Sequence, residues 1–283
     1  MEILVAKSAG FCFGVEKAIE SVYKEIETGK KPIYTFGPII HNEQVVEDLE
    51  EKGVSVIDTI EELENLQSGS VVIRSHGVPK KIYDAIEKQN LEIVDATCPF
   101  VKKIHNIVKK ESEEGKKIVI IGNDNHPEVE GIKGWVVGEA IVIKDEEDIE
   151  KIDSFRNESI CIVSQTTFNY NKFKYLVEII TKKGYDINVV NTICNATHLR
   201  QVEAKEIASK VDAMIVIGGK NSSNTQKLYD ICKNECKDTY YIQTVSNLNL
   251  KNVDSLRSIG ITAGASTPKK IIEEVVLNVR DEF

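Results

Sequence analysis

Short apolar runs alternate along the chain with longer segments in which apolar residues recur at helical spacing. Runs such as 32–36, 117–122 and 212–219 are strand-sized and rich in β-branched residues. Segments such as 14–29, 99–115 and 145–152 bring an apolar residue back every three or four positions, which predicts amphipathic helices. Strands that alternate with helices favour parallel sheets with helices on both faces. The predicted fold class is therefore α/β.

This alternation repeats three times, and a cysteine marks each repeat. Cys12, Cys98 and Cys194 stand where a strand-like run gives way to a helix-like one, 86 and 96 residues apart. The last repeat lacks a final strand, which the apolar N-terminus can supply. We predict three similar α/β domains with mainly parallel sheets, in pseudo-threefold arrangement around a central cluster. The predicted units are 13–97, 98–193, and 194–283 completed by the N-terminal strand 1–12.

Polar loops recur at matching distances from these cysteines. In parallel sheets, ligands bind beyond the carboxyl ends of the strands, so loops at matching phases are candidate site loops. The residues at these phases are His41, His126 and Ser222, 28 or 29 residues after a cysteine, and His76, Thr166 and Ser266, 64 to 72 residues after it. We predict that they converge on one site with the three cysteines.

Bulk properties exclude several classes of partner. A net charge of −9 and a pI near 5.3 argue against a nucleic-acid or anionic-membrane surface. No apolar run approaches the length of a transmembrane helix. The N-terminus begins a strand at once, without the basic and apolar regions of a signal peptide. Six cysteines in such a chain indicate a reducing compartment, so we expect a cytoplasmic protein that acts on a small molecule.

The three phased cysteines differ in context from the other three. Cys161 lies inside a predicted strand and is expected in the core. Cys232 and Cys236 share a helix face but have no counterpart in the other repeats, so we interpret them as structural thiols. Three soft ligands from three repeats predict a metal or cluster with one position left open by protein.

Two other interpretations of these cysteines stay open. Together with one histidine they would suit tetrahedral zinc, although zinc-type CxxC spacing is absent. Alternatively the chain is a non-catalytic binder of small phosphorylated ligands, and the cysteines are merely buried. Elemental analysis distinguishes the first alternative, and replacing all three cysteines by alanine distinguishes the second.

The loop NDNHPE at 123–128, followed by VEG, offers a candidate acid. Glu128 follows His126 and Pro127, where it is either a proton donor beside a histidine or a first-turn helix acid favoured by the helix dipole. Glu130 is a competing carboxylate. Spacing alone leaves both interpretations of Glu128 open. The two histidines on predicted helices, His105 and His198, are expected to be structural.

Hydroxyl and amide side chains gather in three further loops. The run KNSSN at 220–224 precedes a helix, so its side chains and the helix N-terminus predict an anion cradle. SQTT at 164–167 and AST at 265–267 supply more hydroxyls. The GxxxxGK[ST] pattern is absent, which excludes a nucleotide P-loop, and GxGxxG is absent too.

Taken together, these motifs resemble the family of 4-hydroxy-3-methylbut-2-enyl diphosphate reductases, which act last in the non-mevalonate isoprenoid route. The resemblance extends from Met1 to about Arg280. The motifs that carry it are AGFCFGVEKAI, GPIIHN, RSHGVP, DATCPFV, HPEVEG, SQTT, TICNAT, GGKNSSNT and GASTP. One departure is His198-Leu199, where a polar pair is expected before Arg200-Gln201. This departure affects fine positioning and not the activity.

The resemblance implies an iron–sulfur reductase. Cys12, Cys98 and Cys194 would hold a [4Fe–4S] cluster whose fourth iron binds the substrate hydroxyl, and an electron donor such as ferredoxin or flavodoxin would supply electrons. Glu128 would be the proton source, with Thr166 beside the substrate hydroxyl and His126 as a further donor or proton relay. The implied diphosphate-binding set is His41, His76, His126, Ser222, Ser223, Asn224 and Ser266.

Overall fold

The computed structural model describes residues 2–250 and 256–281, so the outer ends of the predicted units, Met1 and Phe283, lie outside it. The chain divides into two units. The C-terminal unit comprises residues 1–15, 41–43 and 194–283, and the central unit comprises 16–40 and 44–193. Residues 41–43 thus belong to a different unit from the residues on either side of them.

Every sheet within the described residues is four-stranded and parallel, which confirms the predicted α/β class and the three parallel sheets. The C-terminal unit holds one sheet and the central unit holds two. The division into three domains and their pseudo-threefold arrangement remain predictions.

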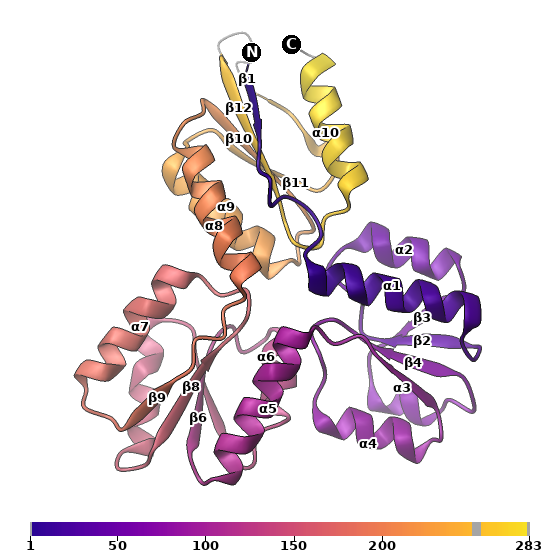
Figure 1. The fold of residues 1–283 in the computed structure, drawn as a ribbon, viewed down its shortest axis with the longest axis vertical. Helices are drawn as coiled ribbons and strands as arrows, with labels where there is room; N and C mark the ends of the chain where they lie inside the picture. Colours follow the sequence, from indigo (N-terminus) through magenta and orange to yellow (C-terminus); the bar gives the residue numbers. More distant parts are fainter. Residues whose placement is uncertain (1, 251–255, 282–283) are drawn as a thin grey trace. The chain divides into compact units, whose positions relative to one another are not determined.

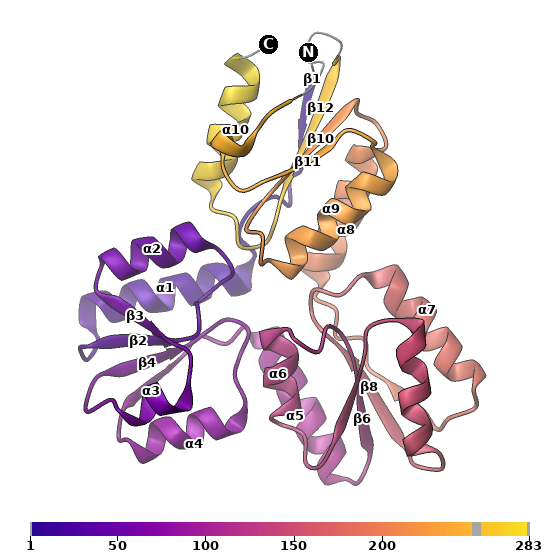
Figure 2. The same cartoon turned by 180° about the vertical axis from the view of Figure 1, so that it is seen from behind.

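The sheet of the C-terminal unit has the order β1-β12-β10-β11, so the first strand pairs with the last. Helices α8 and α9 cover one face and α10 covers the other (Figure 1), and Figure 2 shows the same layers from behind. The elements are β1 (Glu2–Val5), α8 (Asn195–Ala208), β10 (Ala213–Ile217), α9 (Ser223–Glu235), β11 (Thr239–Ile242), the 3₁₀ helix η2 (Val245–Asn247), β12 (Ser258–Ala263) and α10 (Lys269–Asp281).

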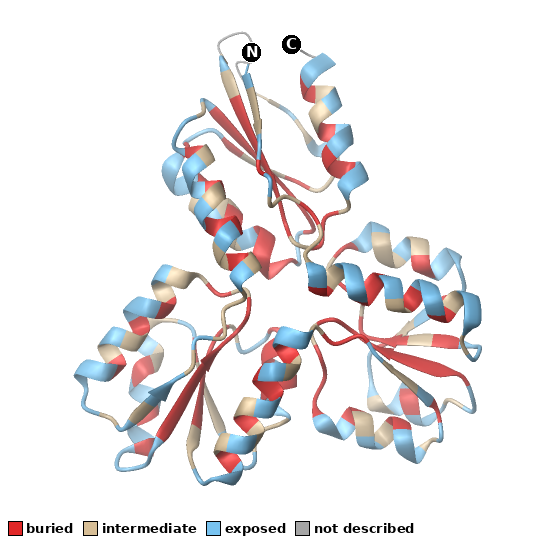
Figure 3. Ribbon diagram, in the orientation of Figure 1, coloured by how far each residue is buried: buried red, intermediate tan, exposed pale blue. Residues whose placement is uncertain are grey.

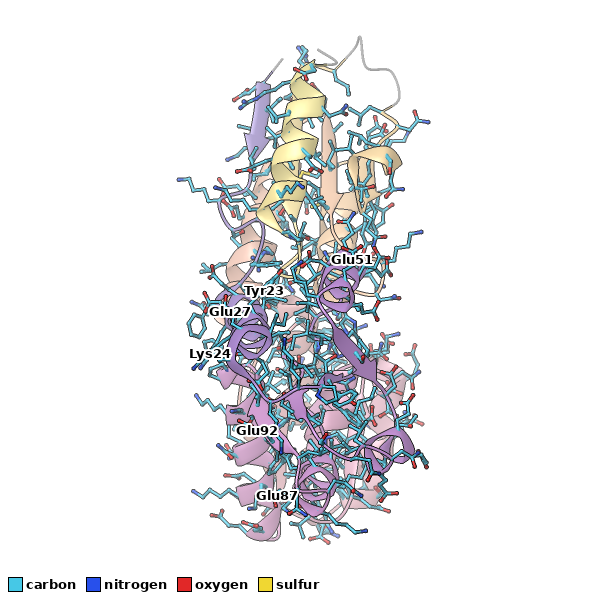
Figure 4. All side chains as sticks on the ribbon, turned by 90° about the vertical axis from the view of Figure 1, so that its right-hand side faces the viewer. Tyr23, Lys24, Glu27, Glu51, Glu87 and Glu92 are labelled. Atoms are coloured by element: carbon cyan, nitrogen blue, oxygen red, sulfur yellow. The ribbon has the colours of Figure 1, made fainter. Side chains whose placement is uncertain are left out.

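The first sheet of the central unit has the order β3-β2-β4-β5. Helices α3 and α4 pack on one face and α1 and α2 on the other (Figure 1). Tyr23 of α1 donates a hydrogen bond to Asp48 of α2 at 2.6 Å, and its neighbours Lys24 and Glu27 project outward (Figure 4). The elements are α1 (Phe13–Thr28), β2 (Ile33–Phe36), α2 (Glu43–Glu51), β3 (Val54–Ile57), α3 (Ile60–Glu64), β4 (Ser70–Ile73), α4 (Lys80–Lys88) and β5 (Glu92–Asp95).

The second sheet of the central unit has the order β7-β6-β8-β9. Helices α5 and α6 cover one face, and α7 with the 3₁₀ helix η1 covers the other. Its middle strands are buried along their length, as Figure 3 shows. The elements are α5 (Pro99–Glu113), β6 (Lys117–Ile121), α6 (Pro127–Lys133), β7 (Ala140–Ile143), η1 (Glu146–Phe155), β8 (Ile160–Ser164), α7 (Tyr170–Lys182) and β9 (Ile187–Val189).

Two elements differ from the sequence-based expectation. The helix expected at 145–152 is the 3₁₀ helix η1. Its buried residues Ile149, Ile152 and Phe155 are three apart, a spacing that lies on one face of a 3₁₀ helix and not of a long α-helix. The loop expected at 123–128 ends earlier, because α6 begins at Pro127. Pro at the first helical position and an acid in the first turn were the signals for this start.

None of the helices in the described ranges is both long and apolar enough to span a bilayer.

Trp135 connects α5 with the loop after β4, through an aromatic contact and a hydrogen bond. The His105 ring stacks on Trp135, with centroids 5.3 Å apart, and the Trp135 indole N–H donates to the carbonyl of Val78 at 3.0 Å. A Cβ added at Gly77 would lie 2.5 Å from the His105 ring, so only glycine permits this approach. His105 is therefore a packing residue, as expected, and it braces the loop that carries His76.

Burial of His105 predicts a loss of stability in acid. Burial lowers its pKa from 6.5 to about 4, partly opposed by Asp95, with Lys102 lowering it further. Between these two pH values His105 is protonated in the unfolded chain but neutral in the folded chain. The free energy of unfolding therefore falls as the pH drops from 6.5 towards 4, by on the order of 2–3 kcal/mol. His105→Leu should remove this part of the pH dependence in urea unfolding at pH 7.5 and pH 5. Identical pH dependence in the two proteins would contradict the prediction.

Candidate functional site

A buried carboxylate lies at the end of the second central sheet. Glu128, in the first turn of α6, is 2% exposed. One of its oxygens accepts the backbone N–H of Thr166 at 2.6 Å, and the other accepts the Thr166 hydroxyl at 2.7 Å. Thr166 follows β8, so α6 and the loop after β8 are joined by these two bonds. A carboxylate and a hydroxyl in direct contact form a path for proton transfer.

His126 and His76 lie beside this pair. His126 caps the N-terminus of α6, and its Nδ1 accepts the backbone N–H of Glu128 at 3.1 Å, which orients the ring. The rings of His76 and His126 meet edge to face, with centroids 5.6 Å apart. His76 comes from the loop after β4, so the two sheets of the central unit each contribute one histidine.

Cys98 belongs to the same neighbourhood. It stands directly before α5 as its N-cap, and its backbone N–H donates to the carbonyl of Ser75, next to His76, at 3.0 Å. The helix N-terminus carries partial positive charge, which favours an anionic sulfur at this position. The central unit thus brings together Cys98, His76, His126, Glu128 and Thr166.

The other two phased cysteines belong to the C-terminal unit. Cys12 stands directly before α1, and its backbone N–H donates to Ala265 at 3.2 Å. Cys194 is the N-cap of α8. Arg200 of α8 donates hydrogen bonds to the carbonyls of Ser8 and Gly10 in the loop before Cys12. The helix that begins after Cys194 is therefore in contact with the loop that leads to Cys12.

Burial separates the phased cysteines from the remaining three. Cys12, Cys98 and Cys194 are partly exposed, whereas Cys161, Cys232 and Cys236 are buried. Burial raises the pKa of Cys161 to about 11 and that of Cys232 to about 12, so these thiols stay protonated. Among the six cysteines, only the phased three combine partial exposure with a helix N-terminus, a setting that favours the thiolate form. These three thiols are therefore the candidate soft ligands of the chain.

The predicted anion cradle, residues 220–224, lies at the N-terminus of α9. The Ser222 hydroxyl caps this helix by accepting the N–H of Thr225, and the Lys227 ammonium donates to the Ser223 hydroxyl at 2.8 Å. Asn224 is 4% exposed, and neither atom of its amide group has a hydrogen-bond partner within the described part of the chain. A buried polar group without a partner is costly unless a ligand or water satisfies it. The cradle therefore has unmet capacity for a polar ligand.

Residues 41–43 dock beside this cradle. The Asn42 amide donates to the Ser266 carbonyl at 2.9 Å, and the Ser266 hydroxyl donates to the His41 carbonyl at 3.2 Å. The Glu43 carboxylate accepts from Asn221 at 3.4 Å and also from Gln243. This reciprocal pairing brings His41 and Ser266, two predicted site residues, into direct contact.

Each unit thus gathers one part of the predicted site. The C-terminal unit holds Cys12, Cys194, His41, Ser222, Ser223, Asn224 and Ser266, and the central unit holds the rest. That both sets serve one centre remains a prediction. Sequence reasoning missed Asn42, Lys227 and Arg200. The contact of Lys227 could have been predicted, because Lys227 lies one helical turn from Ser223. The contacts of Asn42 and Arg200 could not, because their partners are distant in the sequence.

Comparison with known proteins identifies the family. The family model described as LytB protein matches residues 3–280. The chain belongs to the LytB protein family.

Its similarity to individual LytB proteins extends over the whole length. It is 49% identical over 282 residues to the 4-hydroxy-3-methylbut-2-enyl diphosphate reductase of Caldanaerobacter subterraneus subsp. tengcongensis, covering 99% of this chain and 97% of that protein. The reductase of Clostridioides difficile is 46% identical over 276 residues, covering 98% of both. The resemblance drawn from the motifs is thereby confirmed at the level of the family.

Two solved structures are similar as well. The reductase of Plasmodium falciparum has a TM-score of 0.92 at 29% identity, covering 98% of this chain and 87% of that one. A second structure, described as the terminal enzyme of the non-mevalonate pathway, has a TM-score of 0.72 at 41% identity, covering 99% of this chain and 100% of that one. The fold of this chain is therefore that of the family.

The docking of residues 41–43 predicts a specific sensitivity at Asn42. Asn42→Ala leaves the buried Ser266 carbonyl without its donor, which should cost about 1–3 kcal/mol of unfolding free energy and speed amide exchange at 41–43. Urea unfolding and hydrogen exchange by mass spectrometry measure both. The matched control is Asn221→Ala, whose exposed contact to Glu43 should be worth less than about 0.5 kcal/mol. Equal effects of the two variants would contradict the prediction.

Proposed function

We propose that this chain reduces (E)-4-hydroxy-3-methylbut-2-enyl diphosphate to isopentenyl diphosphate and dimethylallyl diphosphate. Two electrons and two protons enter, the carbon–oxygen bond to the hydroxyl breaks, and the oxygen leaves as water. Reductase activity on this diphosphate is the one by which the chain's relatives are named. The observation that carries the proposal is the buried Glu128–Thr166 pair.

Glu128 is proposed as the proton source. Because it is buried and held by two bonds to Thr166, its position is determined before substrate binds. When Glu128 is protonated, its proton can pass to the Thr166 oxygen while the Thr166 hydroxyl proton moves to the substrate. His126 holds the first turn of α6 and so supports the same pair. Thr166 is accordingly proposed to lie beside the substrate hydroxyl, and His126 is proposed as a further donor.

The diphosphate is proposed to bind the hydroxyl and amide groups of the C-terminal unit together with the three histidines. The unmet hydrogen-bonding capacity of the Asn224 amide and the Lys227 ammonium on Ser223 support an anionic ligand there. Binding energy from the diphosphate, remote from the reacting carbon, would hold that carbon in register for reaction. The set is His41, His76, His126, Thr166, Ser222, Ser223, Asn224 and Ser266.

Cys12, Cys98 and Cys194 are proposed to hold a [4Fe–4S] cluster with one iron not ligated by protein. Their partial exposure and their places before helices support this choice over the three buried thiols. Such a cluster supplies single electrons and a Lewis-acidic iron. The protein's own part is to present the thiolates and to position the substrate.

The electrons are proposed to come from ferredoxin or flavodoxin. The sequence contains no dinucleotide-binding motif from which a hydride could be drawn. A cytoplasmic, reducing compartment suits both the carrier and a thiolate-bound cluster.

Metal content separates this function from its alternatives. Protein purified without oxygen should be brown and should contain roughly four iron and four sulfide per chain. Stoichiometric zinc without sulfide would support the zinc site instead. A colourless protein that cannot be reconstituted, and that binds diphosphates equally well with all three cysteines changed to alanine, would support the binder.

Glu128→Gln tests the proton source directly. The substitution keeps size and polarity but removes the acid, so kcat should fall by about 10²–10⁴-fold while the cluster absorbance stays unchanged. Turnover is measured with a reduced viologen dye as electron source.

Glu130→Gln is the control for this experiment. Glu130 lies two residues further on α6 and is exposed, so its kcat should remain within about twofold of the parent. A Glu128→Gln variant that also turns over at the parent rate would remove Glu128 from the proposed role.

A further inference from the structure

A single buried arginine joins α8 to the loop before Cys12. Arg200 is 3% exposed. Its Nε donates to the carbonyl of Ser8 at 2.9 Å, and its Nη2 donates to the carbonyl of Gly10 at 2.8 Å. Both acceptors lie within four residues of Cys12, so the guanidinium fixes the path of the backbone that delivers this cysteine.

Glu203, one turn further along α8, accepts hydrogen bonds from the same loop. Its carboxylate accepts the backbone N–H groups of Lys7 at 2.8 Å and Ser8 at 2.9 Å, and also the Ser8 hydroxyl. Because Cys194 is the N-cap of α8, the helix that begins at one cysteine holds the loop that ends at the other. The relative position of Cys12 and Cys194 is therefore set by two side chains of α8.

Arg200 and Glu203 together form a clamp on the loop before Cys12, and one hydrogen-bond donor of Arg200 takes no part in it. The Nη1 of Arg200 is buried and has no hydrogen-bond partner in residues 2–250 and 256–281. Leaving a charged donor buried and unsatisfied is costly. Burial lowers the pKa of Arg200, while the charges of Cys12, Cys194 and Glu203 oppose this, so the groups that favour its charge are the two sulfurs and one carboxylate. An arginine side chain remains protonated even so.

We propose that Arg200 is a positioning residue of the sulfur centre, which clamps the Cys12 loop to α8 and offers its Nη1–H and positive charge to the sulfur ligands. This inference rests on the cluster proposed above. Hydrogen bonds and positive charge at the sulfurs stabilise the reduced, more negative state of a cluster and so raise its reduction potential. The unused donor is thereby satisfied in the loaded protein.

Arg200→Gln tests the electrostatic part. The variant removes the charge while keeping a polar side chain, so at a fixed ambient potential the ratio of reduced to oxidised cluster should fall about tenfold, equivalent to about 59 mV. Arg200→Lys keeps the charge and should recover most of the potential. The measurement is a spectroelectrochemical titration of the anaerobic protein.

Two control variants separate charge from structure. Lys205→Gln removes the same charge from the same helix at an exposed position paired with Glu235, and should leave the potential unchanged. Glu203→Gln loosens the same loop but removes a negative charge, so it should not lower the potential. The electrostatic part of the proposal would be overturned if the reduction potential of Arg200→Gln equalled that of the parent. It would also be overturned if the potentials of Arg200→Gln and Glu203→Gln decreased by the same amount.

The clamp itself is measured without the cluster. In metal-free protein, Arg200→Gln should speed amide exchange at residues 7–12 and alkylation of Cys12 severalfold, with no change in Lys205→Gln. Unchanged rates would overturn the clamp. If the parent protein never binds iron, the cluster proposal fails, whereas faster exchange in Arg200→Gln would still support the clamp.

Discussion

Parallel pairing of strands is the constraint on which the candidate site depends, because it aligns the carboxyl ends of neighbouring strands. Ile73 of β4 pairs with Asp95 of β5, and three residues later each strand delivers a site residue, His76 and Cys98. The register of β10 with β12 likewise aligns Ile217 with Ala263, ahead of the serine loops. Residues far apart in the chain therefore meet because their distances from the strand ends are matched, and a shift of register would separate them.

Much of this arrangement was predictable from the sequence, since strand and helix lengths and the phases of polar residues are local properties. Cys98 was predicted as a site residue in this way, whereas the role of Glu128 was predicted only from the resemblance to the family. A helix was predicted at η1 but its 3₁₀ form was not, because an apolar spacing of three fits a short α-helix as well. The roles of Asn42 and Arg200 could not be predicted, because their partners Ser266, Ser8 and Gly10 lie about 190 or more residues away.

Buried polar groups in the two units differ in how they are satisfied. Glu128 is fully engaged by Thr166, so the proposed acid is rigid before any ligand arrives. The Asn224 amide and the Arg200 Nη1 are buried without partners in the described chain. A buried polar group without a hydrogen-bond partner lowers stability, and a ligand that satisfied it would offset this cost.

The groups proposed for the reaction are divided between the units. The central unit holds the proposed proton-transfer pair, and the C-terminal unit holds the proposed hydroxyl and amide cradle with two of the three phased cysteines. Residues 41–43 are the exception to this division, because they are covalently continuous with one unit and hydrogen-bonded within the other. The bond from Asn42 to Ser266 therefore lies within the C-terminal unit, in which the anion cradle is proposed.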